Sequence, residues 1–435
     1  MAGFDPVFIQ LMKSSQQGHS HAELWRRNLP LAWFAIFCGV FSFSFIFPFI
    51  PLYIGTLGVS EPGRAALWSG LIGGAGGLGM FIGAPVWGMA GDRYGRKNNM
   101  VRALLGSAVA LALMGFSTNV YQLLGFRLLA GFMSGIPPTA MALVASQAPR
   151  SKTSFCMGLL QMAMFTGSTL GPLIGGFLTG VLGFQRTFFA AGGIVALVGL
   201  AVLLLVKEEF QRPEELTAVG PRRQLRLFFE AVTTREVLTV LGVLAMIQFS
   251  PVIMFPVLPL FLEELAGGSV STVSSGIAFS AMGFTSALSS LLMAQLGERV
   301  GLKRLIVVCA ALSGAFYLPM LVVDAPYQAI ALVAVLGLFS GAMLSSTSAL
   351  LGLAVPREQH GRAFGASQSA VSIAFAIGPL LGGVFAVTLG LRNVFLVSAV
   401  SFFLVSFVSL KFIKIRRQED VYPDSGRTSA ATDER

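Results

Sequence analysis

The few residues of this chain that could do chemistry lie at the borders of long apolar runs. The heptad "GDRYGRK" at 91–97 places Asp92 among Arg93, Arg96 and Lys97, between two such runs. A carboxylate among cations can form ion pairs. When it is released from a cation and partly desolvated, its pKa can rise enough for it to bind a proton near neutral pH. Arg93, Arg96 and Lys97 can also serve simply to fix the orientation of the chain in a membrane, and we expect that they do so as well.

Arg127 is the one charge that we place deep inside an apolar run. A cation buried in a membrane costs several kcal/mol unless it is paired or wetted, so a function is the default hypothesis. The alternative is that Arg127 extends to a nearby membrane surface, which Tyr121 and Gln122 mark. Both readings stay open at the level of sequence.

The sequence shows no other combination of residues that is typical of catalysis or metal binding. We find no HExxH motif, no Ser/His/Asp set and no pair of carboxylates at one membrane depth, so we expect no enzyme. Cys38, Cys156 and Cys309 lie inside apolar runs without pair spacing, so we predict neither a disulfide nor a metal site. No carboxylate lies in the middle of any run, which disfavours a central carboxylate for cationic ligands.

The composition shows which elements must position these residues. The chain has 435 residues, of which 54% are hydrophobic and 11% charged, whereas a soluble protein has about 25% charged residues. Apolar runs long enough to cross a bilayer indicate an all-α membrane protein. We predict twelve transmembrane helices, at 30–57, 66–90, 99–117, 120–146, 154–181, 184–206, 236–262, 272–296, 303–323, 327–354, 361–388 and 391–413.

The positions of Lys and Arg predict the orientation. If both termini are cytoplasmic, the outer loops hold only Arg64, Arg186 and Arg392 of the 30 basic residues. The net charge of +10 then reflects topology and attraction to anionic lipid, not binding to nucleic acid. We expect a multi-pass protein of a plasma membrane, with a bacterial inner membrane as the expected location.

The sequence repeats itself with an offset of 206 to 208 residues. The heptad recurs as "GERVGLK" at 297–303, "FPFIPLY" at 47–53 corresponds to "FPVLPLF" at 255–261, and Gln161 corresponds to Gln368. Six helices per half give both halves the same orientation, as in transporters of two bundles. We predict a cytoplasmic segment, a six-helix bundle, a cytoplasmic linker, a second bundle and a cytoplasmic tail, at 1–29, 30–206, 207–235, 236–415 and 416–435. The linker is either a short amphipathic helix on the membrane surface or a solvated connector.

Three motifs in register resemble the major facilitator superfamily: "GMAGDRYGRK" from Gly88, Arg127 with Gly131 and Gly135, and "GSTLGPLIGG" from Gly167. Further stretches, among them "WRRNLPLAWF" and "ALVASQAPR", resemble its bacterial multidrug exporters of the MdtG and PmrA kind, which are drug:proton antiporters. The resemblance implies the major facilitator fold, two pseudo-symmetric six-helix bundles that work by alternating access. It also implies no cofactor, with the proton as coupling ion, and we expect a monomer.

The resemblance also assigns roles to residues near the gate. It implies that Asp92 accepts hydrogen bonds from helix amides of the facing half and pairs with an Arg, which would lock the cytoplasmic side shut. It implies close backbone approach and a tight turn at Gly88 and Gly95, and a part in proton coupling for Arg127. Gly171 and Pro172 are expected at the interface on which the bundles rock. The gating and coupling candidates are Gly88, Asp92, Arg93, Gly95, Arg96, Arg127, Gly171 and Pro172.

The expected cavity lies between the bundles and binds a hydrophobic or amphiphilic small molecule. Thioethers and aromatic faces suit varied apolar ligands, and an amide inside a membrane helix needs a partner. The substrate-binding candidates are Phe45, Phe49, Met133, Met141, Gln161, Gln248, Phe255 and Gln368. We expect proton-coupled efflux of hydrophobic compounds. The alternative is a transporter or flippase of an amphiphile such as a glycolipid or lysolipid.

Overall fold

A computed structural model describes most of the chain. The described residues are 6–46, 49–59, 61–149, 152–208, 234–267, 272–355 and 360–413. Within these ranges the description covers the backbone alone at 6–23, 92, 154, 291, 293–299 and 360–365. The amphipathic segment proposed for the linker lies outside the described residues.

The described part of the first half consists of helices joined by short turns. Its helices are α1 (Pro6–Ser44), α2 (Ile50–Thr56), α3 (Pro62–Tyr94), α4 (Arg96–Gly115), α5 (Val120–Met133), α6 (Ile136–Gln147), α7 (Thr153–Leu182) and α8 (Phe184–Leu205). Helix α1 begins well before the predicted boundary at residue 30, so part of the predicted N-terminal segment continues the first membrane helix.

The described part of the second half repeats this plan. Its elements are α11 (Arg235–Met254), α12 (Leu258–Leu265), α13 (Thr272–Val300), α14 (Leu302–Tyr317), the 3₁₀ turn η1 (Leu318–Leu321), α15 (Pro326–Ala354), α16 (His360–Leu389) and α17 (Asn393–Phe412). Nine stretches of the described residues are long and apolar enough to cross a membrane. The other three predicted spans are also helical. The first is occupied by α1 together with α2, the third by α4 and the eighth by α13.

Three of the predicted spans are broken into two helices. The first is divided between α1 and α2, the fourth between α5 and α6, and the seventh between α11 and α12. The first and seventh are repeat mates, so this break is symmetric. The fourth span is broken, whereas its mate α15 runs without interruption from Pro326 to Ala354.

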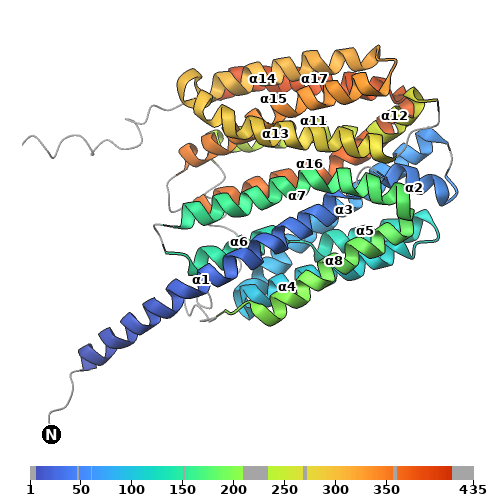
Figure 1. Cartoon of the computed structure of the whole chain (residues 1–435). Coiled ribbons are helices and arrows are strands. Elements are labelled where there is room, and N and C mark those ends of the chain that lie inside the picture. Colours follow the sequence, from blue (N-terminus) through green and yellow to red (C-terminus); the bar gives the residue numbers. More distant parts are fainter. Residues whose placement is uncertain are drawn as a thin grey trace, which may run out of the picture.

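The helices form two bundles, which Figure 1 shows in blue to green for the first half and in yellow to red for the second. Within the first bundle α1 contacts α7, α3 contacts α5, and α4 contacts α8; within the second, α11 contacts α16, α13 contacts α15, and α14 contacts α17. Between the bundles, α3 contacts α16, α7 contacts α13, and α2 contacts α12. We call the end that holds the α3–α4 turn and Lys207 the linker end, and the end that holds α2 and α12 the opposite end.

Candidate functional site

The interface between the bundles is built from glycines that allow close backbone approach. A Cβ on Gly70 of α3 would collide with the carbonyl of Pro379 in α16, and a Cβ on Gly77 would collide with Ala376. The repeat mates make the equivalent contacts: Gly276 of α13 lies against the Pro172 carbonyl of α7. The two pairs of helices therefore form one pseudo-symmetric interface, as duplication of the chain predicts.

These close approaches lie in the half of the molecule next to the opposite end. They run from Gly63 to Gly77 on α3 and from Thr169 to Gly180 on α7. A hydrogen bond joins the bundles in the same half: Thr272 Oγ1 of α13 donates to the Gly176 carbonyl of α7 at 2.7 Å. The described contacts therefore close the opposite end.

Only part of the predicted rocking motif contacts the other bundle. Pro172 and Gly176 lie against α13, whereas a Cβ on Gly171 would meet Phe41 and Ser44 of α1 in the same bundle. Gly171 lies inside its own bundle in this conformation, because successive glycines on a helix point to different neighbours. Its part in the rocking interface stays a prediction. Gly171 tightens the first bundle, and Pro172 contributes to the interface.

Arg127 is buried in the first bundle, one helix away from the interface. Its side chain is 1% exposed. Its guanidinium Cζ lies 4.3 Å from the centroid of the Phe43 ring, and a Cβ on Gly76 would approach Nε to 2.9 Å. Gly76 precedes Gly77, which touches Ala376 of the second bundle. Arg127 therefore does not extend to the membrane surface; it is held directly behind the interface.

The break between α5 and α6 is held by side chains from α3 and α4. Pro137 and Pro138 have no N–H, so the carbonyls of Met133 and Ser134 lack their helical donors. Arg102 supplies both, with Nη1 at 2.7 Å from the Met133 oxygen and 3.3 Å from the Ser134 oxygen. Gly135 has φ of 111°, which favours glycine at this turn.

The side chains of Trp87 and Asn99 hold Arg102 in place. Its Cζ lies 3.8 Å from the Trp87 ring centroid, and Nη2 donates to Asn99 Oδ1 at 2.7 Å. Trp87 Nε1 donates to the Phe132 carbonyl at 2.7 Å, and Asn99 Nδ2 donates to the Trp87 carbonyl at 2.9 Å. Together they satisfy the last carbonyls of α5, the helix that carries Arg127.

The loop motif lies at the turn from α3 to α4. Gly95 has φ of 97°, which accounts for a glycine in this tight turn. The close backbone approach expected at Gly88 is not present in this conformation, since a Cβ on it would have nothing within 4 Å. The side chain of Arg93 is exposed, and that of Asp92 lies outside the described side chains, so the latch stays a prediction.

Glu208 caps the helix that this motif begins. The backbone N–H of Arg96 donates to Glu208 Oε1 at 3.0 Å, and that of Lys97 donates to Oε2 at 2.8 Å. A carboxylate at a helix N-terminus satisfies free amides and interacts favourably with the helix dipole. Asn28 Nδ2 donates to the Lys207 carbonyl at 2.7 Å and to Gln147 Oε1 at 2.8 Å, which ties α1 and α6 to the start of the linker.

The predicted ligand-binding residues divide into exposed, half-buried and core positions. Gln161 on α7 and its mate Gln368 on α16 are both exposed, on helices of the interface. The half-buried ones are Met133, Met141, Gln248 and Phe255. The Phe255 ring centroid lies 5.4 Å from that of Phe279 and 6.2 Å from that of Phe375, so these rings connect α11, α13 and α16.

Phe45 and Phe49 do not line an open cavity in this conformation. Both are buried, with 1% and 0% exposure. The Phe49 ring lies 5.3 Å from Phe188 and 5.9 Å from Phe184, inside the core of the first bundle. The Phe45 ring packs against Phe41, Phe49 and Gly175 of α7. Contact of these two rings with a ligand stays a prediction.

The described carboxylates lie at the ends of helices. They are Glu61, Glu208, Glu236, Glu263, Glu264 and Asp324. The three cysteines are buried and free. Among the described residues no group of three His, Cys, Asp or Glu side chains could hold a metal ion.

Two residues of the site were missed by sequence reasoning. Arg102 lies in the predicted span 99–117 and was given no role, although the Pro137–Pro138 pair signals carbonyls that need another donor. Glu208 directly follows the end of α8, and no sequence signal shows which helix it caps.

The family model of the Major Facilitator Superfamily matches residues 32–281 and 253–432. The chain is 35% identical to the multidrug resistance protein MdtG of Rahnella sp. (strain Y9602), over 86% of this chain and 90% of that protein. It is 34% identical to the multi-drug resistance efflux pump PmrA homolog of Lactococcus lactis subsp. lactis, over 90% of this chain and 96% of that protein.

Solved structures share the fold. The bacterial homolog of the human lysosomal transporter Spinster, in an inward-facing and unoccupied conformation, superposes with a TM-score of 0.71 at 17% identity, covering 91% of this chain and 99% of that one. The human organic anion transporter MFSD10 gives 0.64 at 19% identity, covering 88% and 99%. The chain is a multi-pass membrane protein and belongs to the major facilitator superfamily.

Proposed function

We propose that this protein exports hydrophobic small molecules from the cell by alternating access of its two bundles, with the proton as coupling ion. Two groups of relatives that align with most of the chain are named multidrug resistance or efflux proteins, which supports this class of cargo. The fold supports the transport cycle, because two bundles that touch along a thin glycine interface can rock.

The observation that carries the proposal is the position of Arg127. The guanidinium is buried behind Gly76, and the next residue, Gly77, forms the interface with α16. A charge in a packed site changes its interactions when the neighbouring backbone shifts, because desolvation and nearby charges both act strongly there. Rocking at this interface is therefore coupled to the electrostatics of the first bundle.

The basic residues support an orientation with the linker end in the cytoplasm. Arg93, Arg96 and Lys97 lie at that end, whereas the loops of the opposite end contain Arg64, Arg186 and Arg392. In this orientation both termini are cytoplasmic and the described contacts close the outer side. The conformation is then the one that accepts cargo from the cytoplasm or the inner leaflet.

The described side chains favour an uncharged or weakly polar cargo. Gln161 and Gln368 are exposed at equivalent positions on α7 and α16, where amides can bind a polar group of the ligand. Phe255 and Met141 offer polarizable apolar surface. The described carboxylates lie at helix ends, so proton uptake takes place near a gate, with Asp92 as the candidate at the linker end.

Transport in proteoliposomes tests the proposal. Purified protein is reconstituted, a pH gradient is imposed, and accumulation of a hydrophobic fluorescent dye is compared with flipping of a fluorescent lysolipid. The controls are protein-free liposomes and the same vesicles after an uncoupler has collapsed the gradient. Gradient-dependent dye accumulation is expected. Lysolipid movement without dye transport, or dye transport that ignores the gradient, would refute the proposal.

A further inference from the structure

Two helix contacts between the bundles close the opposite end, and both are built on one plan. One joins α7 to α13, and the other joins α3 to α16. Gly276 lies against the Pro172 carbonyl in the α7–α13 contact, and its mate Gly70 lies against the Pro379 carbonyl in the α3–α16 contact. Because the chain is duplicated, a difference between the two contacts shows a property that one of them has and the other lacks.

One position of the two contacts differs in chemistry but not in geometry. A Cβ on Gly176 would meet the Thr272 carbonyl at 2.5 Å, and a Cβ on Gly383 would meet the Ala66 carbonyl at 2.6 Å. The repeat offset of 206 residues likewise places Ala66 at the position of Thr272. The α7–α13 contact therefore carries a hydroxyl where the α3–α16 contact carries only a methyl group.

The Thr272 hydroxyl forms a hydrogen bond from one bundle to the other. Its Oγ1 donates to the Gly176 carbonyl at 2.7 Å, and both residues are buried. Thr179 of α7 shows the alternative, because its Oγ1 donates at 2.7 Å to the Gly175 carbonyl of its own helix. A hydroxyl that is bonded within one helix keeps its partner when the bundles move. The Thr272 bond, in contrast, must break when α7 and α13 separate.

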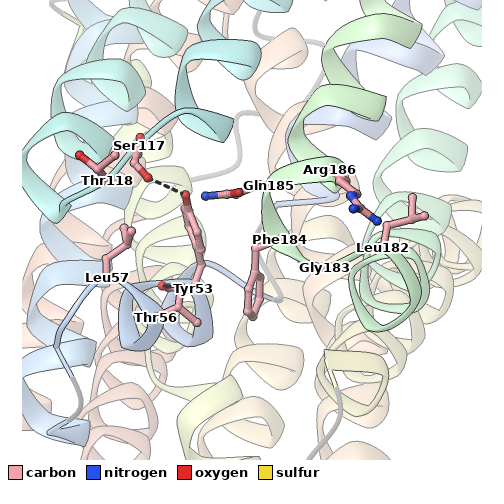
Figure 2. Close-up of a pocket in the computed structure, with 10 residues that line it drawn as sticks. All are labelled: Tyr53, Thr56, Leu57, Ser117, Thr118, Leu182, Gly183, Phe184, Gln185 and Arg186. Atoms are coloured by element: carbon pink, nitrogen blue, oxygen red, sulfur yellow. Dashed lines mark hydrogen bonds between the residues drawn. The ribbon is translucent and has the colours of Figure 1, made fainter.

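The cavity at this end also lies within one bundle. It has a volume of about 480 Å³, and Figure 2 shows that its walls come from α2, from the end of α4 and from the turn between α7 and α8. The hydrogen bond in Figure 2, from Tyr53 Oη to the Ser117 carbonyl at 3.1 Å, likewise joins elements of the first bundle. These walls move together when the bundles rock, so this hydrogen bond is the same whether the opposite end is open or closed.

We propose that the Thr272 hydroxyl, through its one-sided hydrogen bond, stabilises the state in which the opposite end is closed. A contact that exists in only one of two states shifts their equilibrium by its own free energy. An average hydrogen bond between membrane helices changes such a ratio about threefold. The inference rests on the rocking motion proposed above, and it is independent of the cargo and of the coupling ion.

This bias gives an exporter a resting state. With the linker end in the cytoplasm, closure of the opposite end makes the protein accessible to cargo from the cytoplasm. The apparent affinity for cargo on that side is proportional to the fraction of molecules in this conformation. The Thr272 hydroxyl therefore raises the apparent affinity at the side from which cargo is taken up.

Alkylation of the variant A66C, whose thiol lies in the other contact, measures how often the opposite end opens. Ala66 is fully buried, and a thiol fits there because the repeat mate carries a hydroxyl. The buried Cys38, Cys156 and Cys309 are replaced by Ala, and the protein is treated with a maleimide in detergent micelles, at constant pH and without cargo. The thiol reacts when this end opens, so the rate of alkylation reports the population of the open state.

A comparison of T272A with T272S in the A66C background isolates the hydroxyl, since both variants lose the same methyl group. T272A also gives α13 the residue that α3 has at this position. We expect alkylation to be about threefold faster in T272A than in T272S. T179A and T179S are the matched control pair, because the Thr179 hydroxyl is bonded within α7, and they should react at equal rates.

The outcomes separate this inference from the transport cycle. Equal rates in T272A and T272S, or the same ratio of rates in both pairs, would overturn the role of Thr272 and leave alternating access in place. No alkylation of A66C in any variant would show that the opposite end does not open, which would overturn both. The melting temperature of each variant shows whether faster alkylation comes from opening between the bundles or from loss of the fold.

Discussion

The two halves repeat their mutual contacts but not their buried charges. Gly70 lies against Pro379, and its mate Gly276 lies against Pro172. In contrast, the position of Arg127 is occupied in the second half by Val333, which is equally buried. Duplication has thus kept the interface symmetric, as rocking motion requires, while one half alone carries the deep cation.

The same contrast holds for the fourth helix of each half. In the first half, Pro137 and Pro138 break it, and Arg102 satisfies the freed carbonyls. In the second half the mates of the two prolines are Met343 and Leu344, so α15 continues and Val308 takes the place of Arg102. The broken helix and the two arginines thus occur together in the first bundle, where we propose that coupling takes place.

The largest effect is expected from Arg127→Ala. Without the buried cation, gradient-driven dye accumulation should fall to the level of protein-free liposomes, because the charge beside the interface is lost. Some dye binding should remain, since Arg127 is held within the first bundle. The matched control is Val333→Ala, which should keep wild-type accumulation. If Arg127→Ala kept the wild-type dependence on the gradient, the buried cation would not be the difference between the halves that matters for coupling.

A smaller effect is expected when the two loop motifs are compared. Asp92→Asn should lower transport by about tenfold and leave it insensitive to pH, because the amide cannot bind a proton. Glu298→Gln should change transport by less than about twofold. Its motif has Leu302 at the position of Arg96 and is therefore incomplete. The measurement is initial transport rate at several imposed gradients and matched protein density. Equal losses would show that both loops act as latches.

The smallest effect on transport, with a clear effect on stability, is expected from Arg102→Leu. It leaves the carbonyls of Met133 and Ser134 without donors, so the free energy of unfolding should fall by about 2–3 kcal/mol. Val308→Leu, at the repeat mate, should change it by less than about 0.5 kcal/mol. Chemical unfolding in lipid–detergent micelles measures both. Equal stability of the two variants would mean that water or a rearranged helix replaces Arg102.

Sequence reasoning predicted much of the fold because membrane helices carry a strong local signal. The apolar runs gave the spans, and the offset between Gln161 and Gln368 gave the two halves. The position of Arg127 inside an apolar run left open whether it is buried or extends to the surface, and the structure shows it buried against Phe43. These features depend on composition and on repeats, both of which are visible without coordinates.

The rest depends on which side of a helix faces which neighbour. Phe45 and Gly171 lie in the span and motif expected, yet the rotation of α1 and α7 turns both into the first bundle. Glu208 caps α4 across 112 residues of chain, a contact that local patterns do not encode. The sequence did contain a signal for the role of Arg102. Pro137 and Pro138 lack N–H groups, so the carbonyls one turn before them need another donor.

Distances between spin labels test the central claim. This claim is that proton binding switches the protein between a state closed at the linker end and a state closed at the opposite end. One label pair, at Tyr94 and Val300, reports the linker end; the other, at Tyr121 and Tyr327, reports the opposite end. Each pair joins repeat mates in different bundles, and the two tyrosines at the opposite end are both 70% exposed. The buried Cys38, Cys156 and Cys309 are first replaced by Ala, so that only the chosen positions are labelled.

Double electron–electron resonance is then recorded in liposomes at about pH 5 and at about pH 8, which bracket the range where a desolvated carboxylate titrates. If the predicted latch opens when Asp92 is protonated, the Tyr94–Val300 distance should lengthen at low pH while the Tyr121–Tyr327 distance shortens. At high pH both changes should reverse, and Asp92→Asn should hold the low-pH distances throughout. Two distances that change in the same direction, or that do not respond to pH, would contradict proton-coupled alternating access.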